Sequence, residues 1–230
     1  MYKNLFFDAD GTIYDFHASE VFALDLVWNE FNLPKETQNI YLECNHKCWD
    51  DFEKKKITID QLKVKRFADF LRIINNNTIN QDVISEKFLE ALSEKGILYE
   101  ESRGILEELK RRGFNIYIVT NGVKKVQEGR FSLHLKEGLF KQVFCSEALG
   151  VGKPQKEFFD KVFTQLKFNE DDIKRSIIIG DSLSSDIQGG INAGIPTVWI
   201  NRNNAPSKPN IKPTYQINRL DELLSIFSAN

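Results

Sequence analysis

The stretch Leu5-Phe6-Phe7-Asp8-Ala9-Asp10-Gly11-Thr12 places an apolar run directly before two acidic residues and a glycine. A short continuous apolar run is typical of a strand that is buried on both faces of a sheet. Asp8 and Asp10 stand two positions apart, so on an extended chain both side chains project to the same side. Gly11 permits a sharp turn whose backbone N–H groups can face anionic oxygens. The stretch therefore predicts a buried strand that ends in a pair of carboxylates.

Four further apolar, β-branched runs follow along the chain, with helical patterns between them. The runs cover residues 116–119, 143–145, 177–179 and 197–200. Alternation of strands and helices indicates a parallel sheet with helices on both faces. We therefore expect an α/β fold whose ligands bind beyond the carboxyl ends of the strands. The segment from Asn201 to Asn218 is expected to be an extended loop that leads to a short last strand and helix.

The segment between about residues 17 and 95 shows no clear strand. Apolar residues at helical spacing predict four helices there, through residues 21–31, at about 36–54, from Thr58 through 71, and through 83–92. Thr58 with Gln61 three positions later is typical of a capping box. These helices either extend the core or form an inserted bundle. We favour the insert, with a core domain of residues 1–16 and 97–230 and a helical domain of residues 17–96.

Composition narrows the class of protein. The chain has 230 residues and a formal net charge of −2, which gives no electrostatic footprint for a nucleic acid polymer or an anionic membrane. No stretch approaches the roughly 20 apolar residues of a membrane span, and no export signal is recognised at Met1. Three cysteines, an odd and low count, suggest reduced thiols. We expect a cytoplasmic globular protein that is a monomer or a homodimer.

Polar residues follow several of the predicted strands at the point where each strand ends. Thr120 and Asn121 follow the second strand, Asp181 and Asp186 follow the fourth, and Lys153 lies in a loop with glycine and proline. Carboxylates gathered at one sheet edge repel each other and raise one another's pKa unless a cation lies among them. Oxygen ligands suit Mg²⁺, and a lysine ammonium suits a phosphate. The pattern therefore predicts a magnesium and phosphate site at this edge.

Phosphoryl transfer requires an assembly of this kind. Positioning and cationic stabilisation supply most of the catalysis, because the transition state spreads charge over the equatorial oxygens. A carboxylate can attack as a nucleophile and form an aspartyl-phosphate. A second carboxylate can protonate the leaving oxygen and later deprotonate water, an effect of about 10²–10⁴-fold. Asp8 and Asp10 are the candidates for these two tasks.

Four stretches in this order and spacing resemble the sequence motifs of the haloacid dehalogenase superfamily. They are Asp8-Ala9-Asp10-Gly11-Thr12, Val119-Thr120-Asn121-Gly122, Lys153-Pro154 and Gly180-Asp181-Ser182-Leu183-Ser184-Ser185-Asp186. The resemblance implies a three-layer, Rossmann-like parallel sheet core with an inserted helical-bundle cap of the C1 type. The predicted insert at residues 17–96 would be that cap.

The resemblance also implies a role for each acidic residue. Asp8 would be the nucleophile and a metal ligand. Asp10 would be the general acid and base, with its backbone carbonyl on Mg²⁺. Asp181 would bind the metal through its side chain, and Asp186 would act from outside the coordination shell by orienting a metal-bound water or Lys153.

The same resemblance assigns the phosphate group of the substrate to three residues. Thr120, Asn121 and Lys153 would hold the phosphoryl oxygens. The implied cofactor is Mg²⁺, and the implied partner is a small-molecule phosphoester. Relatives that displace halide lack an acid at the position of Asp10, so dehalogenation is not expected.

The helical segment from Tyr41 to Phe70 resembles the bacterial pyrimidine 5′-nucleotidase branch of the superfamily (the YjjG/YfnB group). Within it, Trp49 and Phe52 are either base-stacking residues or part of an aromatic core. We therefore expect a magnesium-dependent phosphatase of small phosphomonoesters, with nucleoside 5′-monophosphates as substrates and an aspartyl-phosphate intermediate. The alternatives are a sugar-phosphate phosphatase or phosphomutase of the same superfamily, or a binding protein that has kept the fold.

Overall fold

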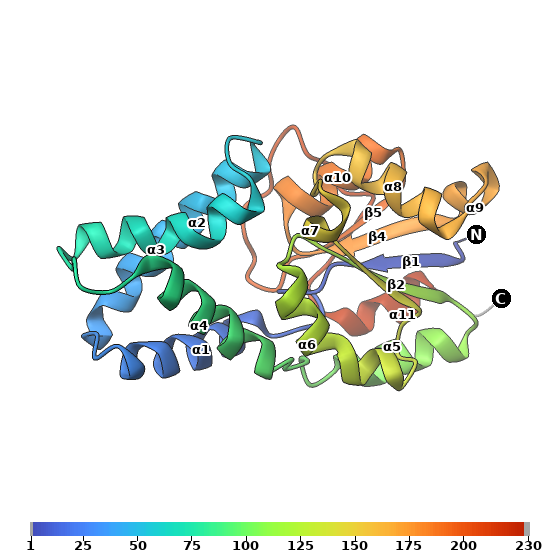
Figure 1. Ribbon diagram of the computed structural model, residues 1–230. Coiled ribbons are helices and arrows are strands. Elements are labelled where there is room, and N and C mark those ends of the chain that lie inside the picture. The colour runs from blue at the N-terminus through green and yellow to red at the C-terminus, as the bar shows by residue number, and fades with distance from the viewer. Residues whose placement is uncertain (1, 228–230) are drawn as a thin grey trace. The chain divides into compact units, whose positions relative to one another are not determined.

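The computed structural model describes residues 2–227, which divide into two compact units. Unit 1 consists of residues 2–16, 97–124 and 131–227, and unit 2 consists of residues 17–96 and 125–130. The chain thus leaves unit 1 once for the long helical segment and a second time within a single helix. Figure 1 shows the course of the chain through both units.

The strands and the long helices follow the order expected from the apolar runs and the helical spacing. The strands are β1 (Asn4–Phe7), β2 (Asn115–Thr120), β3 (Gln142–Cys145), β4 (Ser176–Gly180), β5 (Thr197–Ile200) and β6 (Tyr215–Ile217). The helices are α1 (Phe16–Glu30), η1 (Lys35–Thr37), α2 (Gln38–Glu53), α3 (Ile59–Ile73), α4 (Gln81–Glu94), α5 (Ser102–Arg111), α6 (Lys124–Lys136), α7 (Ser146–Leu149), α8 (Lys156–Leu166), α9 (Glu170–Lys174), η2 (Leu183–Ile187), α10 (Gln188–Ala193), η3 (Leu220–Glu222) and α11 (Leu223–Ile226).

A six-stranded sheet forms the centre of unit 1. Its strand order is β3-β2-β1-β4-β5-β6, and all the paired strands are parallel. Phe7, the last residue of β1, is paired with Ile118 of β2 and with Ile179 of β4. Because these strands run in the same direction, the residues that follow β1, β2 and β4 emerge at one edge. The α/β fold with a parallel sheet is therefore confirmed.

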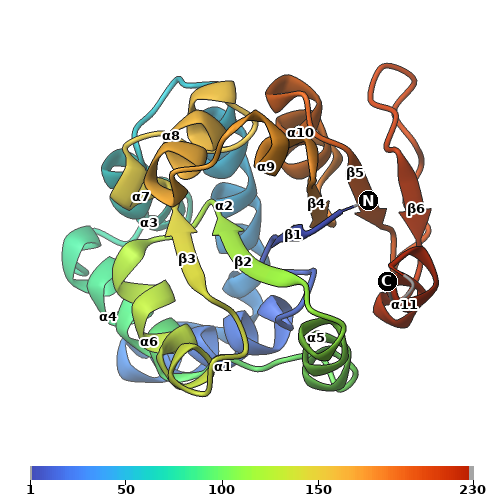
Figure 2. The ribbon, with the colours of Figure 1, turned by 90° about the vertical axis from the view of Figure 1, so that its right-hand side faces the viewer.

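Alternate side chains of β1, β2 and β4 enter two different apolar clusters, which makes unit 1 a three-layer structure. Leu5 and Phe7 pack with α5 and α11, whereas Phe6 between them packs with α8. Figure 2 shows α8, α9 and α10 on one side of the sheet and α5 and α11 on the other. Since both faces of the sheet are covered, the middle residues of the inner strands are apolar, and this explains the continuous runs in the sequence.

Unit 2 is a helical bundle with its own aromatic core. The rings of this core are Trp28, Tyr41, Phe67, Phe70 and Phe88, with centroid distances from 4.6 to 6.1 Å. The predicted capping box is present at the start of α3, where the Thr58 side chain accepts from the backbone N–H of Gln61. Trp49 and Phe52 lie outside this core, are half-buried and contact each other edge to face.

The two segments that connect unit 1 with α1 and α4 lie side by side within unit 1. The backbone N–H of Asp15 donates to the carbonyl of Ile97 at 2.8 Å, and that of Tyr99 donates to Ile13 at 3.1 Å. The chain therefore leaves and re-enters the sheet unit at neighbouring points. Among residues 2–227, no helix is both long enough and apolar enough to cross a lipid bilayer.

Candidate active site

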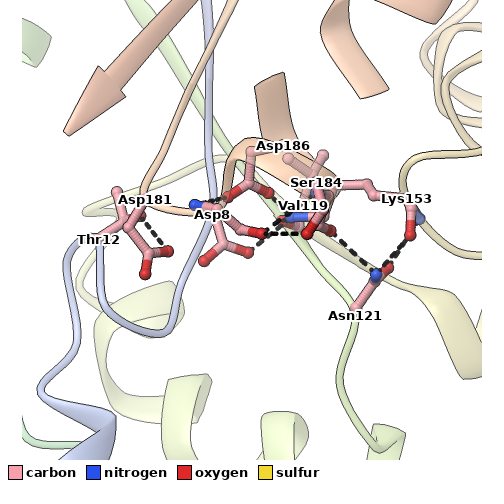
Figure 3. Close-up of polar contacts among 10 residues, drawn as sticks. Asp8, Thr12, Val119, Asn121, Lys153, Asp181, Ser184 and Asp186 are labelled. Carbon is pink, nitrogen blue, oxygen red and sulfur yellow. Dashed lines mark hydrogen bonds and ion pairs between the residues drawn. The ribbon is translucent and has the colours of Figure 1, made fainter. Parts of the chain in front are cut away.

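Three carboxylates of unit 1 meet at the carboxyl edge of the sheet. Asp8 follows β1, Asp181 follows β4, and Asp186 lies in the short helix η2. One carboxylate oxygen from each of the three residues lies within 4.8 Å of the others. Figure 3 shows these side chains together with Lys153 and Asn121. Asp8 and Asp181 are 173 positions apart in the sequence. They are neighbours because β1 and β4 are adjacent strands.

Lys153 holds two of these carboxylates. Its Nζ lies 2.6 Å from Oδ1 of Asp8, 2.6 Å from Oδ1 of Asp186 and 2.7 Å from the carbonyl oxygen of Val119. The side chain is 1% exposed, so the ion pairs are shielded from water. An ammonium has three N–H donors, and each of them has one acceptor here. Lys153 is therefore fixed in position beside the predicted nucleophile.

Asn121 positions the Lys153 loop instead of pointing its amide into open space. Its Nδ2 donates to the carbonyl of Lys153 at 2.7 Å and to Oγ of Ser185 at 3.2 Å, and its Oδ1 accepts from the backbone N–H of Lys153 at 2.8 Å. The second oxygen of Asp186 accepts from the backbone N–H of Ser182 at 3.0 Å. Both oxygens of Asp186 are therefore engaged by protein groups.

Two glycines make room for the acidic side chains. Gly11 has a φ of +82°, and a Cβ there would come within 2.4 Å of Oδ2 of Asp181. A Cβ on Gly180 would come within 2.3 Å of Asp186. Any larger residue would push the carboxylate away, and at Gly11 it would also strain the backbone. The motif glycines thus serve the close approach of backbone and carboxylate.

The remaining predicted residues lie at the same edge. Thr120 is the last residue of β2 and is buried, and Asp10 is half-buried in the turn after β1. In that turn, Oγ1 of Thr12 donates to Oδ1 of Asp181 at 3.4 Å. The indole N–H of Trp199, at the end of β5, donates to the backbone carbonyl of Asp181 at 2.8 Å. All the residues predicted to act in catalysis, phosphate binding or metal binding therefore come from unit 1.

The electrostatics of the site favour a bound cation. Burial raises the pKa of Asp8 well above its usual value. The positive charge of Lys153 lowers this pKa, while the negative charges of Asp186, Asp181 and Asp10 raise it. Desolvation by the surrounding protein and the charge of Asp186 raise the pKa of Asp181 to about 7, although its side chain is accessible to water. Burial alone would lower the pKa of Lys153, but Asp186 and Asp8 outweigh it and raise that pKa.

The donor set fits Mg²⁺. When ionised, three carboxylates and one ammonium leave a formal charge of −2, which a divalent cation would neutralise. Hard oxygen donors are the ligands that Mg²⁺ prefers, and Mg²⁺ sites commonly use one or two carboxylates with water and substrate oxygens. Asp8 and Asp181 are the side chains suited to direct contact, because both oxygens of Asp186 already bind Lys153 and Ser182.

The raised pKa of Asp181 predicts a pH-dependent loss of stability in the metal-free protein that Mg²⁺ should remove. A carboxyl with a folded-state pKa of about 7, against 3.8 ordinarily, holds its proton longer in the folded than in the unfolded chain. The metal-free protein should therefore lose stability as the pH rises from about 4 to about 7. Saturating Mg²⁺ binds the ionised form and should remove this loss. Urea unfolding at several pH values measures the stability of the metal-free protein in EDTA and of the metal-bound protein in Mg²⁺. A metal-free stability that rises over this pH range would contradict the prediction.

One buried polar contact within unit 1 was not foreseen from the sequence. The hydroxyl of Tyr14 lies 2.6 Å from Nδ1 of His134, and both side chains are buried. Burial, and then the charge of Arg103, lowers the pKa of His134. The two residues are 120 positions apart, and each is isolated in sequence, so no local pattern could have paired them.

Comparison with known proteins shows the family to which the chain belongs. A family model described as haloacid dehalogenase-like hydrolase matches residues 2–194. The chain is 35% identical to the HAD-hydrolase YfnB of Bacillus subtilis, over 99% of this chain and 96% of that protein. It is 32% identical to the pyrimidine 5′-nucleotidase PynA of Streptococcus pneumoniae, over 100% of this chain and 96% of that protein.

A solved structure of YfnB superposes on this chain. Its TM-score is 0.88 at 36% sequence identity, and 99% of each chain is covered. That crystal structure is described as bound to magnesium and as revealing interdomain movement.

Proposed function

The chain belongs to the haloacid dehalogenase-like hydrolase family, and on this premise we propose that it is a magnesium-dependent phosphatase of nucleoside 5′-monophosphates. The observation that carries the proposal is the buried Lys153 with Nζ 2.6 Å from Asp8, next to Asp181. This arrangement offers one carboxylate for attack and two positive charges, a lysine and a metal ion, for the phosphoryl group.

In the proposed reaction, Asp8 attacks the phosphorus atom of the substrate. A new P–O bond forms to the Asp8 carboxylate while the ester P–O bond breaks, and Asp10 gives its proton to the leaving oxygen. Asp10 then takes a proton from a water molecule, whose oxygen bonds to the phosphorus atom of the aspartyl-phosphate. The P–O bond to Asp8 breaks, which releases inorganic phosphate and restores the Asp8 carboxylate. Lys153, Thr120 and the backbone around Asn121 would hold the phosphoryl oxygens, while the Asn121 side chain keeps the Lys153 loop in place.

Magnesium would be held by the side chains of Asp8 and Asp181 and by the backbone carbonyl of Asp10. When bound, it neutralises the carboxylates and the developing charge on phosphate. We further propose that unit 2 is the cap over the site, with hinges at residues 16–18 and 97–102. The paired connecting segments and the description of interdomain movement in YfnB support this assignment.

The pyrimidine preference rests on the relatives and on unit 2. PynA is named a pyrimidine 5′-nucleotidase and aligns over the whole chain. Trp49 and Phe52 are half-buried, which leaves aromatic surface on unit 2 for a base. The presence of Asp10 as a proton donor argues for phosphoester hydrolysis over halide displacement.

The test is a panel of phosphoesters with purified protein. We expect phosphate release from dUMP, dTMP and UMP to require Mg²⁺ and to exceed release from purine nucleotides and sugar phosphates. Faster hydrolysis of sugar phosphates than of nucleotides would identify the protein as a sugar-phosphate phosphatase instead of a nucleotidase. Isomerised sugar phosphate without free phosphate would identify a mutase, and no turnover of any ester would contradict the proposal.

A further inference from the structure

The loop after β5 contains an arginine that binds both segments connecting the sheet unit to the helical unit. Nη1 of Arg202 lies 2.6 Å from Oε1 of Glu101, and its guanidinium carbon lies 4.1 Å from the ring centroid of Tyr99. Both of these residues belong to the segment that returns from unit 2. Nη2 donates to the backbone carbonyl of Thr12 at 3.0 Å, which belongs to the outgoing segment. One planar group therefore holds both segments at once.

Thr12 connects Arg202 with the proposed metal ligand Asp181. The Thr12 hydroxyl donates to Oδ1 of Asp181, and the turn that Arg202 holds by its carbonyl also carries Asp10 and Gly11. Trp199, three residues before Arg202, donates to the backbone carbonyl of Asp181. The end of β5 thus contacts both the main chain of a proposed metal ligand and the turn that faces it.

Arg202 and Asp181 line the same pocket. Arg202, Gly11, Tyr99 and Asp181 contribute to the wall of a pocket of about 330 Å³ within unit 1. The Arg202 side chain is only 20% exposed, so its ion pair with Glu101 is largely shielded from water. A guanidinium presents donors in a rigid, planar fork, whereas a lysine presents one nitrogen. The fork is what allows one residue to bind Glu101 and the Thr12 carbonyl together.

We propose that Arg202 is a positioning residue of the phosphatase site: by clamping the Asp10–Thr12 turn and the Tyr99–Glu101 segment, it fixes the carboxylate geometry that binds Mg²⁺. The inference rests on the proposed function, because Asp181 is a metal ligand only in that account. Groups that orient metal ligands from outside the coordination shell affect metal affinity by about 10–100-fold when they are removed. A misplacement of about 1 Å at a reacting group lowers rates by about 10²-fold.

The experiment compares Arg202→Met with Arg112→Met. Arg112 is a matched control in the same unit, and its side chain is 17% exposed. It pairs with Glu108 at 2.8 Å and donates to the carbonyls of Leu224 and Phe227, and it contacts none of the site aspartates. We expect Arg202→Met to weaken Mg²⁺ binding at least about 10-fold in calorimetry without substrate. It should lower kcat for dUMP about 10–100-fold with KM nearly unchanged. Arg112→Met should lose stability only.

A second variant covers the case in which Arg202→Met does not fold. Arg202→Lys keeps a cation beside Glu101 but loses the fork, so its Mg²⁺ affinity should still fall several-fold while its Tm stays near that of the wild type. Wild-type Mg²⁺ affinity and kcat in the folded variants, or equal losses in Arg112→Met, would overturn the proposal. A wild-type protein that binds Mg²⁺ but releases no phosphate would instead contradict the proposed function, while the calorimetric difference would still decide the role of Arg202.

Discussion

Asp8→Asn is expected to lower kcat for phosphate release by about 10⁴-fold or more, a loss typical of an enzyme deprived of its nucleophile. Asparagine keeps the shape of the side chain but cannot form the aspartyl-phosphate. Colorimetric phosphate release from dUMP at saturating Mg²⁺ measures this loss. Asp221→Asn, at an exposed ion pair with Arg219, serves as the matched control and should keep the wild-type rate.

The fold should survive this substitution. Burial and three neighbouring acids raise the pKa of Asp8, so its ionised form is disfavoured in the metal-free protein. Removing that charge should leave the metal-free Tm unchanged or higher, while the increase in Tm on addition of Mg²⁺ shrinks. Near-wild-type turnover by Asp8→Asn would rule out Asp8 as the nucleophile, whatever the stability result.

Lys153→Met is expected to lower the free energy of unfolding by about 3–5 kcal/mol at pH 7.5 in EDTA. Lys153 is 1% exposed, and its ammonium contacts Asp8 and Asp186 at 2.6 Å. Without it, two carboxylates remain in a site that water barely reaches. Methionine fills most of the volume, so the loss would come from charge and not from a cavity. Urea unfolding followed by circular dichroism measures the change.

The pH dependence distinguishes charge from packing in this variant. Without the lysine, the pKa of Asp8 should rise further above its unfolded value. A carboxyl with a raised folded-state pKa destabilises the fold above that pKa, and the effect fades as the pH falls towards the unfolded value. The deficit of Lys153→Met should therefore be smaller at pH 5 than at pH 7.5, and a second change, Asp186→Asn, should reduce it.

Lys156→Met provides the control for a surface lysine. Its ion pair with Asp160 is exposed on both sides, so the substitution should change stability by less than about 1 kcal/mol. A pH-independent deficit in Lys153→Met would mean that packing, not charge, explains the loss. In that case the role of Lys153 as the cation of the site would need revision.

The strands of this protein could be predicted closely because their environment is simple. The middle residues of a strand that is covered on both faces are mostly apolar, and the run Leu5-Phe6-Phe7 differs from β1 by a single residue, the buried Asn4. The capping box of Thr58 and Gln61 is equally local, since both partners lie within one turn. Bringing Asp8 and Asp181 to one edge followed from the parallel sheet, in which equivalent strand ends must meet. Lys153 lies in a loop beyond α7, and only its chemistry and the family resemblance predicted that it joins them.

The direction of individual side chains could not be predicted in this way. Asn121 was expected at the phosphate from the resemblance alone, yet its amide binds Lys153 and Ser185. Arg202 was expected only as part of an extended loop. Its contacts with Thr12 and Glu101 span 190 and 101 positions, and no local spacing encodes them. Likewise, residues 125–130 continue a helix of the sheet unit in sequence but belong to unit 2 by contact.

The adjacency of the two connecting segments bears on how such proteins diversify. Because Asp15 and Ile97 are hydrogen-bonded to each other, the 80 residues from His17 to Gly96 begin and end at almost one point in space. A genetic insertion, deletion or exchange at that point leaves the sheet and its register untouched. New selectivity can thus arise by exchange of the segment between these two junctions, while the residues of the sheet unit pass on unchanged.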